Sequence, residues 1–133
     1  MKKYILLFMF CLLVGQMLGY KDIRHKELER SLHTALQGDV HNVNIASVTD
    51  FQWDKAYVFP PYTPVEVMRD ELGVQSYKDW SGLGFRDDIN LLVFLHGDQI
   101  AHYAEIDRAF GEFGQNDSLS FTPSHATLTV QRF

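Results

Sequence analysis

Residues 53–59 are mostly apolar, with only Asp54 and Lys55 polar, and two prolines follow. Trp53, Tyr57 and Phe59 would share one face of an extended strand, because successive strand side chains point to opposite faces. Proline lacks the N–H that a sheet ladder needs, so Pro60 ends the pairing. The pattern predicts a strand that stops at the double proline.

A helix is predicted directly after this strand. Thr63 suits the N-cap, Pro64 suits the first helical position, and Glu66 completes a capping box three residues after the cap. The apolar stripe and the glycine that ends the helix are Val65, Met68, Leu72 and Gly73.

Residues 21–36 also have apolar side chains at helical spacing, and a glycine follows at position 38. We expect an amphipathic helix that packs on the domain or acts as a stalk, with a frayed linker as the alternative. Val43 and Ile45 alternate with polar residues within 40–48, which predicts a short strand with one solvated face.

Residues 89–95 form a nearly continuous apolar run, typical of a strand with both faces covered. Gly97 stands at the first central position of the following turn, as a type II′ hairpin requires. A two-residue loop then pairs Val93 with His102. This register places His102 among apolar residues and Glu105 on the opposite, solvated face.

The remaining segments complete the predicted fold. We expect loops over 75–88 and 108–118, and strands over 118–121 and 126–131. The order of elements favours an α+β domain with two helices and one antiparallel sheet of four or five strands. A doubly wound parallel fold would need helices between the last strands, and the sequence predicts none there.

The N-terminus resembles an export signal. Residues 1–20 begin with Met-Lys-Lys and continue as an apolar run, the charged and hydrophobic regions of a signal peptide. The run is barely long enough to cross a bilayer, so a retained membrane anchor is the alternative. We therefore divide the chain into a signal or anchor helix (1–20), an amphipathic helix (21–38) and an α+β domain (39–133) that packs with it.

Cys11 is the only cysteine, and it lies inside the apolar run, not after a small-residue pair as a lipoprotein cysteine would. Removal of residues 1–20 would leave no cysteine, which excludes disulfides, thiolate metal sites and a cysteine nucleophile from the mature chain. Its stability must then come from the apolar core.

Charge excludes one class of partner. Among 133 residues there are 12 Lys and Arg against 17 Asp and Glu, a formal charge of −5. The basic residues are scattered and form no stripe, so we expect no nucleic-acid partner. The sequence contains no internal repeat and no low-complexity run.

Candidate catalytic groups are few. His96 and His102 are predicted on opposite strands facing different ways, and no histidine pair has zinc-ligand spacing, so we expect no metal and no cofactor. Two carboxylates could pair across the sheet as acid and base. The candidates for such a pair are Asp54, Asp87, Asp88, Glu105 and Asp107.

Aromatic residues are the unusual feature, at 14% of the chain. Rings with polar tips are favoured where a surface binds sugars, peptides or proteins, although a small core without disulfides also needs large side chains. The candidate binding residues are Trp53, Tyr57, Tyr62 and Trp80.

Three segments together resemble a type of small exported protein of Gram-positive bacteria. They are the Trp53-Asp54 to Thr63 stretch, of the form WDxxYxFxPYT, the capped helix to Gly73, and the hairpin region from Asp88 to Arg108. The resemblance implies an N-terminal signal or lipoprotein signal and no established activity. It therefore transfers no site residue.

The sequence predicts an extracytoplasmic protein, secreted or anchored by residues 1–20. Its expected function is that of a non-catalytic binding module of the cell envelope whose partner is a protein or an envelope ligand, with membrane contact only through residues 1–20. The alternative is a small extracytoplasmic hydrolase that uses His102 or a carboxylate.

Overall fold

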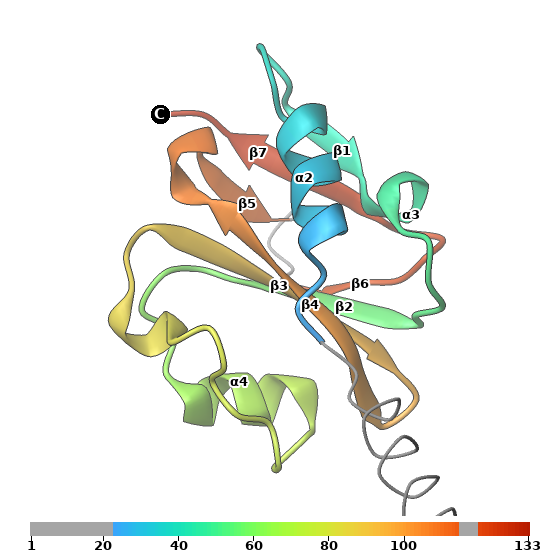
Figure 1. Cartoon of the computed structure of the whole chain (residues 1–133), viewed down its shortest axis with the longest axis vertical. Helices are drawn as coiled ribbons and strands as arrows, with labels where there is room; N and C mark the ends of the chain where they lie inside the picture. The colour runs from blue at the N-terminus through green and yellow to red at the C-terminus, as the bar shows by residue number, and fades with distance from the viewer. Residues whose placement is uncertain (1–22, 115–119) are drawn as a thin grey trace, which may run out of the picture.

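The computed structural model describes residues 23–114 and 120–133 (Figure 1). Within these residues no helix is long and apolar enough to span a membrane. The predicted signal or anchor helix of residues 1–20 lies outside the described part of the chain. The described helices are α2 (Lys26–Ala35), α3 (Ile45–Val48), α4 (Val65–Leu72) and the 3-10 turns η1 (Leu83–Phe85) and η2 (Arg108–Phe110).

The fold is α+β with two antiparallel sheets. One has the order β4-β3-β2-β6 and the other the order β1-β7-β5. The strands are β1 (Asn42–Asn44), β2 (Lys55–Phe59), β3 (Ile89–His96), β4 (Gln99–Asp107), β5 (Glu112–Gly114), β6 (Ser120–Phe121) and β7 (Thr127–Gln131). The class is as predicted, but the strands divide into sheets of four and three, and the described region adds a third helix, α3.

Both faces of the four-stranded sheet are covered. In Figure 1 this sheet crosses the middle of the molecule, with α4 on one side and α2 and the three-stranded sheet on the other. Strand alternation divides the core accordingly, so that Val58 and Phe94 belong to one cluster and Phe59 and Val93 to the other. Seven of the eight residues of β3 are buried, which confirms the prediction for this apolar run.

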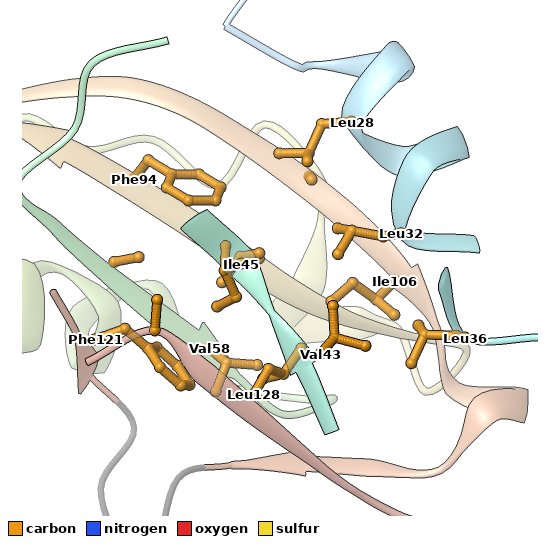
Figure 2. Packing of buried hydrophobic residues seen from close by; sticks show 14 of the residues in the cluster. Leu28, Leu32, Leu36, Val43, Ile45, Val58, Phe94, Ile106, Phe121 and Leu128 are labelled. Atoms are coloured by element: carbon orange, nitrogen blue, oxygen red, sulfur yellow. The ribbon is translucent and has the colours of Figure 1, made fainter. Parts of the chain in front are cut away.

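The larger core cluster lies between the sheets and under α2. Figure 2 shows Leu28, Leu32 and Leu36 pointing from the helical segment toward Val43 and Ile106 on strands. All three leucines are at most 1% exposed. Burial of side chains of this size contributes on the order of 2 kcal/mol each, so α2 is part of the core and not a separate stalk.

The β3–β4 hairpin differs from the predicted register after its turn. Gly97 has a φ of 61°, and Leu95 pairs with Ile100 as expected. The next pair is Phe94 with His102, because Ala101 is an additional residue on β4 and forms a bulge. The predicted pairing of Val93 with His102 is therefore wrong by one residue.

The outer edge of β4 is covered by the residues that precede α2. Tyr103 donates its N–H to the Ile23 carbonyl and accepts the N–H of His25, at 2.8 and 2.9 Å. The helix predicted from residue 21 consequently begins at Lys26, with His25 as its N-cap. The Nδ1 atom of His25 accepts the Leu28 N–H at 2.9 Å.

Three local predictions need correction. Thr63 does not cap α4, because its hydroxyl donates to the Pro60 carbonyl at 2.6 Å and Pro64 takes the N-cap position. The strand predicted over 40–48 stops at Asn44, whose side chain caps α3 by accepting the Ala46 N–H. The loop predicted over 108–118 contains η2 and β5.

Asn90 is a polar residue inside the core, 3% exposed, and its Nδ2 atom has no hydrogen-bond partner among the described residues. An amide buried without a partner costs about 1–3 kcal/mol. Asn90→Leu keeps the number of side-chain heavy atoms and removes this cost. We expect it to raise the free energy of unfolding in urea by about 1–2 kcal/mol, and Asn90→Asp to lower it. A destabilised Asn90→Leu protein would contradict a net cost of the buried amide.

Candidate functional site

The four predicted binding residues do not form one surface. Trp53 and Tyr57 are buried, at 7% and 6% exposure, on opposite faces of the four-stranded sheet. Trp53 was expected on the same face as Tyr57, but β2 begins only at Lys55, so strand alternation does not extend back to it. Its Nε1 donates to the Thr49 hydroxyl at 3.0 Å, and its ring packs against Phe94.

Tyr62 is exposed and has an unusual backbone. Its φ is 62°, the only positive value among the described non-glycine residues, and 57% of its surface is accessible. For a residue with a Cβ this left-handed conformation costs on the order of 1 kcal/mol. The Tyr62 N–H holds the turn in place by donating to the carbonyls of Leu83 and Arg86, both at 3.1 Å.

Those two carbonyls flank Phe85, the most exposed large apolar residue of the described chain, at 92%. The loop that carries it is rigid, because the Asp79 carboxylate accepts the N–H groups of Leu83 and Gly84 at 2.9 and 3.0 Å. We call Tyr62 and Phe85, with the backbone that joins them, the Tyr62–Phe85 surface. Phe85 was not among the predicted binding residues, because the sequence gives no apolar pattern from which its exposure follows.

Trp80 lies in the same loop but belongs to a different part of the surface. It is 48% exposed, and its ring stacks on Tyr103 at 6.4 Å and meets Tyr77 edge-on at 5.2 Å. Tyr77 is buried, and this burial, with a smaller effect of Asp79, raises the pKa of its hydroxyl. Tyr77 therefore stays neutral at physiological pH and serves as a packing partner for Trp80.

The candidate carboxylates are held by structural contacts. Glu105, expected on a solvated face, has a side chain only 11% exposed, placed between Arg86 at 3.0 Å and Arg24 at 3.4 Å. Arg24 in turn binds Glu29 through two 3.0 Å hydrogen bonds. The Oε2 atom of Glu29 accepts the Glu105 N–H, which ties α2 to the edge of β4.

The same chain of charges extends to Asp88. Arg86 binds its carboxylate with bonds of 2.8 and 2.9 Å, which lower the pKa of Asp88 and raise that of Arg86. Of the other candidate carboxylates, Asp54 accepts the Gly97 N–H at 2.7 Å and Asp107 caps η2. Carboxylates whose oxygens already accept such bonds are poorly placed to exchange protons with a substrate.

His102 lies on the sheet face opposite Glu105, because the two residues are an odd number of positions, three, apart on a regular part of β4. Its ring contacts Phe51 at 4.4 Å and His25 at 4.8 Å. The Nδ1 atom of His25 accepts the Leu28 N–H, and its Nε2 atom faces Asp50 at 3.2 Å.

His96 and His102, expected to face different ways, both line a cavity of about 490 Å³. No carboxylate of the described residues lines this cavity. Within the described chain no three His, Cys, Asp or Glu side chains are grouped to hold a metal ion. Among the described residues the cavity brings two histidines together, and the His25 ring that contacts His102 faces Asp50.

A second groove, of about 510 Å³, lies between α2 and the far end of the hairpin. Leu32 and Ile106 contribute to its floor, and its rim carries charges of both signs, including Arg24, Glu29 and Glu105. These three charged side chains form ion pairs with one another, so none of them offers an unpaired charge to a ligand in the groove.

Comparisons with protein-family models, with curated proteins and with solved structures find no match to this chain.

The ion pairs predict a clear difference between two carboxylates that share Arg86. Glu105→Gln leaves two guanidinium groups facing a neutral, nearly buried amide, so we expect the free energy of unfolding to fall by about 1–3 kcal/mol. Asp88→Asn, at a solvent-exposed carboxylate, should leave it unchanged within error. Urea denaturation at neutral pH measures both. Equal effects of the two variants would contradict a structural role specific to Glu105.

Proposed function

We propose that this protein is a non-catalytic, extracytoplasmic binding module of the cell envelope that recognises its partner through the Tyr62–Phe85 surface. The observation that carries the proposal is an exposed aromatic pair on a strained but firmly bonded turn. Phe85 is 92% and Tyr62 57% exposed, and the backbone between them is fixed by hydrogen bonds from Tyr62 and to Asp79.

Neither ring is needed by the core. Both core clusters are complete without these two side chains, which leaves their apolar surface open to water. Exposed aromatic side chains on a rigid support are the residues that contribute most to binding energy when a partner covers them. Strained backbone that persists in a folded protein is also concentrated at functional positions.

Export is a second part of the proposal. The basic start and apolar run of residues 1–20 support a secreted or membrane-anchored protein. The partner would then be a protein or ligand of the envelope.

The rival proposal, an extracytoplasmic hydrolase, has weaker support. A base such as His102 would need a carboxylate within hydrogen-bond reach, and Glu105 lies on the other face of β4 between two arginines. Asp54 is committed to the hairpin turn. A binding role therefore explains the exposed Tyr62 and Phe85 rings, whereas a catalytic role explains neither of them.

The proposal is tested by variants that remove one aromatic ring of the Tyr62–Phe85 surface and keep the fold. Tyr62→Gly removes the ring and leaves a residue that adopts positive φ without a Cβ penalty, and Phe85→Ser removes a ring that makes no core contact. The full chain in mild detergent would be immobilised and exposed to envelope extract. We expect both variants to retain at least tenfold less of the bound component, the loss that corresponds to about 1.4 kcal/mol.

Phe133→Ser is the matched control. Phe133 is 79% exposed, and Figure 1 shows the C-terminus on the far side of the four-stranded sheet from α4. This variant should retain the component like the wild type. Retention of the same components by all four proteins, or of none by the wild type, would overturn the proposal.

A further inference from the structure

The direction in which the chain reaches the domain is fixed by described residues. Arg24 forms a parallel bridge with Tyr103, so residues 23–25 run in the same direction as β4. A chain that runs parallel to β4 approaches Ile23 from the side where β4 begins. That side is the hairpin turn at Gly97 and Asp98.

Trp80 lies at this hairpin end. A cavity of about 310 Å³ is lined by Ile23 and Trp80 together with Asp98 and Ile100, so the indole borders the point where the chain enters the domain. The ring is 48% exposed, while Tyr77 and Tyr103 fix its orientation from below. Tryptophan with one buried and one accessible side is enriched at the interface between membrane and water.

The sequence allows very little separation between the apolar segment and this end of the domain. Only Lys21 and Asp22 stand between Tyr20, the last residue of the predicted signal or anchor, and Ile23. An extended chain advances at most about 3.6 Å per residue, so the three residue steps from Tyr20 to Ile23 span roughly 11 Å. The interfacial layer on each side of a bilayer is itself about 5–8 Å thick.

We propose that, in the full chain, the hairpin end of the domain docks on the lipid bilayer that holds residues 1–20, with the Trp80 indole in the headgroup layer. This inference rests on the anchoring part of the proposed function, not on its partner. It adds a membrane contact by the folded domain to the contact expected from residues 1–20.

The contact depends on the indole and the tether, not on charge. The chain has a formal charge of −5, which does not favour anionic lipid. The short tether instead keeps the indole at high effective concentration beside the interface. Docking should consequently be insensitive to salt, unlike the binding of a basic patch.

Docking at the hairpin end directs the Tyr62–Phe85 surface away from the lipid. Lys55 at the start of β2 pairs with Leu95 beside the hairpin turn, and Phe59 at its end pairs with Leu91. Tyr62 follows that far end, so the strand separates the two sites. The proposed partner would therefore be met from the side of the domain that faces away from the bilayer.

The two tryptophans allow a direct test. The full chain would be reconstituted in phosphatidylglycerol and phosphatidylethanolamine vesicles whose acyl chains are brominated near the headgroups, where bromine quenches indole emission. In Trp53→Phe only Trp80 emits, and in Trp80→Phe only Trp53 emits, from a side chain that is 7% exposed. We expect loss of most of the Trp80 emission, at low and high salt, and no change for Trp53.

Cosedimentation of the full chain with the vesicles must accompany the quenching. Unquenched Trp80 in cosedimented protein would overturn the proposal, and so would failure of the full chain to sediment. If Trp53→Phe does not fold, the difference between wild-type and Trp80→Phe emission gives the same quantity. Phe85→Ser should leave Trp80 quenching unchanged, so a failure of membrane docking and a failure of partner binding are distinguishable.

Discussion

The pairing of residues 23–25 with the edge of β4 determines much of the molecule. Two backbone hydrogen bonds at Tyr103 close an edge that would otherwise offer unpaired groups to other chains. They also set the start of α2, so that its leucines reach the core between the sheets. Glu29 completes the closure by accepting the Glu105 N–H, and Arg24 and Arg86 neutralise the two carboxylates brought together there. The same pairing brings the chain into the domain beside the hairpin turn.

A sheet with two apolar faces needs a covering layer on each face. Here the two layers differ in the number of large apolar side chains that they leave exposed to solvent. The side with α2 and the three-stranded sheet is largely core. The side with α4 carries four of the five exposed large apolar residues of the described chain: Tyr62, Val67, Trp80 and Phe85. This layer is held by a few specific bonds, including those of Asp79 and the Tyr62 N–H, so its rings are presented on short rigid segments. That division supports the proposed binding role, with recognition and membrane contact at different ends of one layer.

Much of this fold could be predicted from the sequence where a local pattern decides the outcome. The apolar run of β3, the proline stop after Phe59 and the glycine at the hairpin turn were such cases. Predictions failed where tertiary contacts decide. The bulge at Ala101 shifted the register, Thr63 bonded to Pro60 instead of capping α4, and Glu105 was buried by two arginines distant in sequence. For the binding residues, a list of aromatics could not separate buried Trp53 and Tyr57 from exposed Tyr62, because their burial depends on which layer covers each position.

The proposed orientation is tested most directly by measuring which end of the domain lies next to the bilayer, the hairpin turn or the Tyr62–Phe85 surface. In a Cys11→Ser background, spin labels would be attached to Asp98→Cys at the hairpin turn and to Phe85→Cys at the binding surface, and the full chain reconstituted in vesicles. The proposed orientation predicts that the label at position 98 is relaxed by a nickel chelate confined to the lipid headgroups, and the label at position 85 by a water-soluble reagent. Equal relaxation of both labels by either reagent, or the reverse pattern, would contradict it.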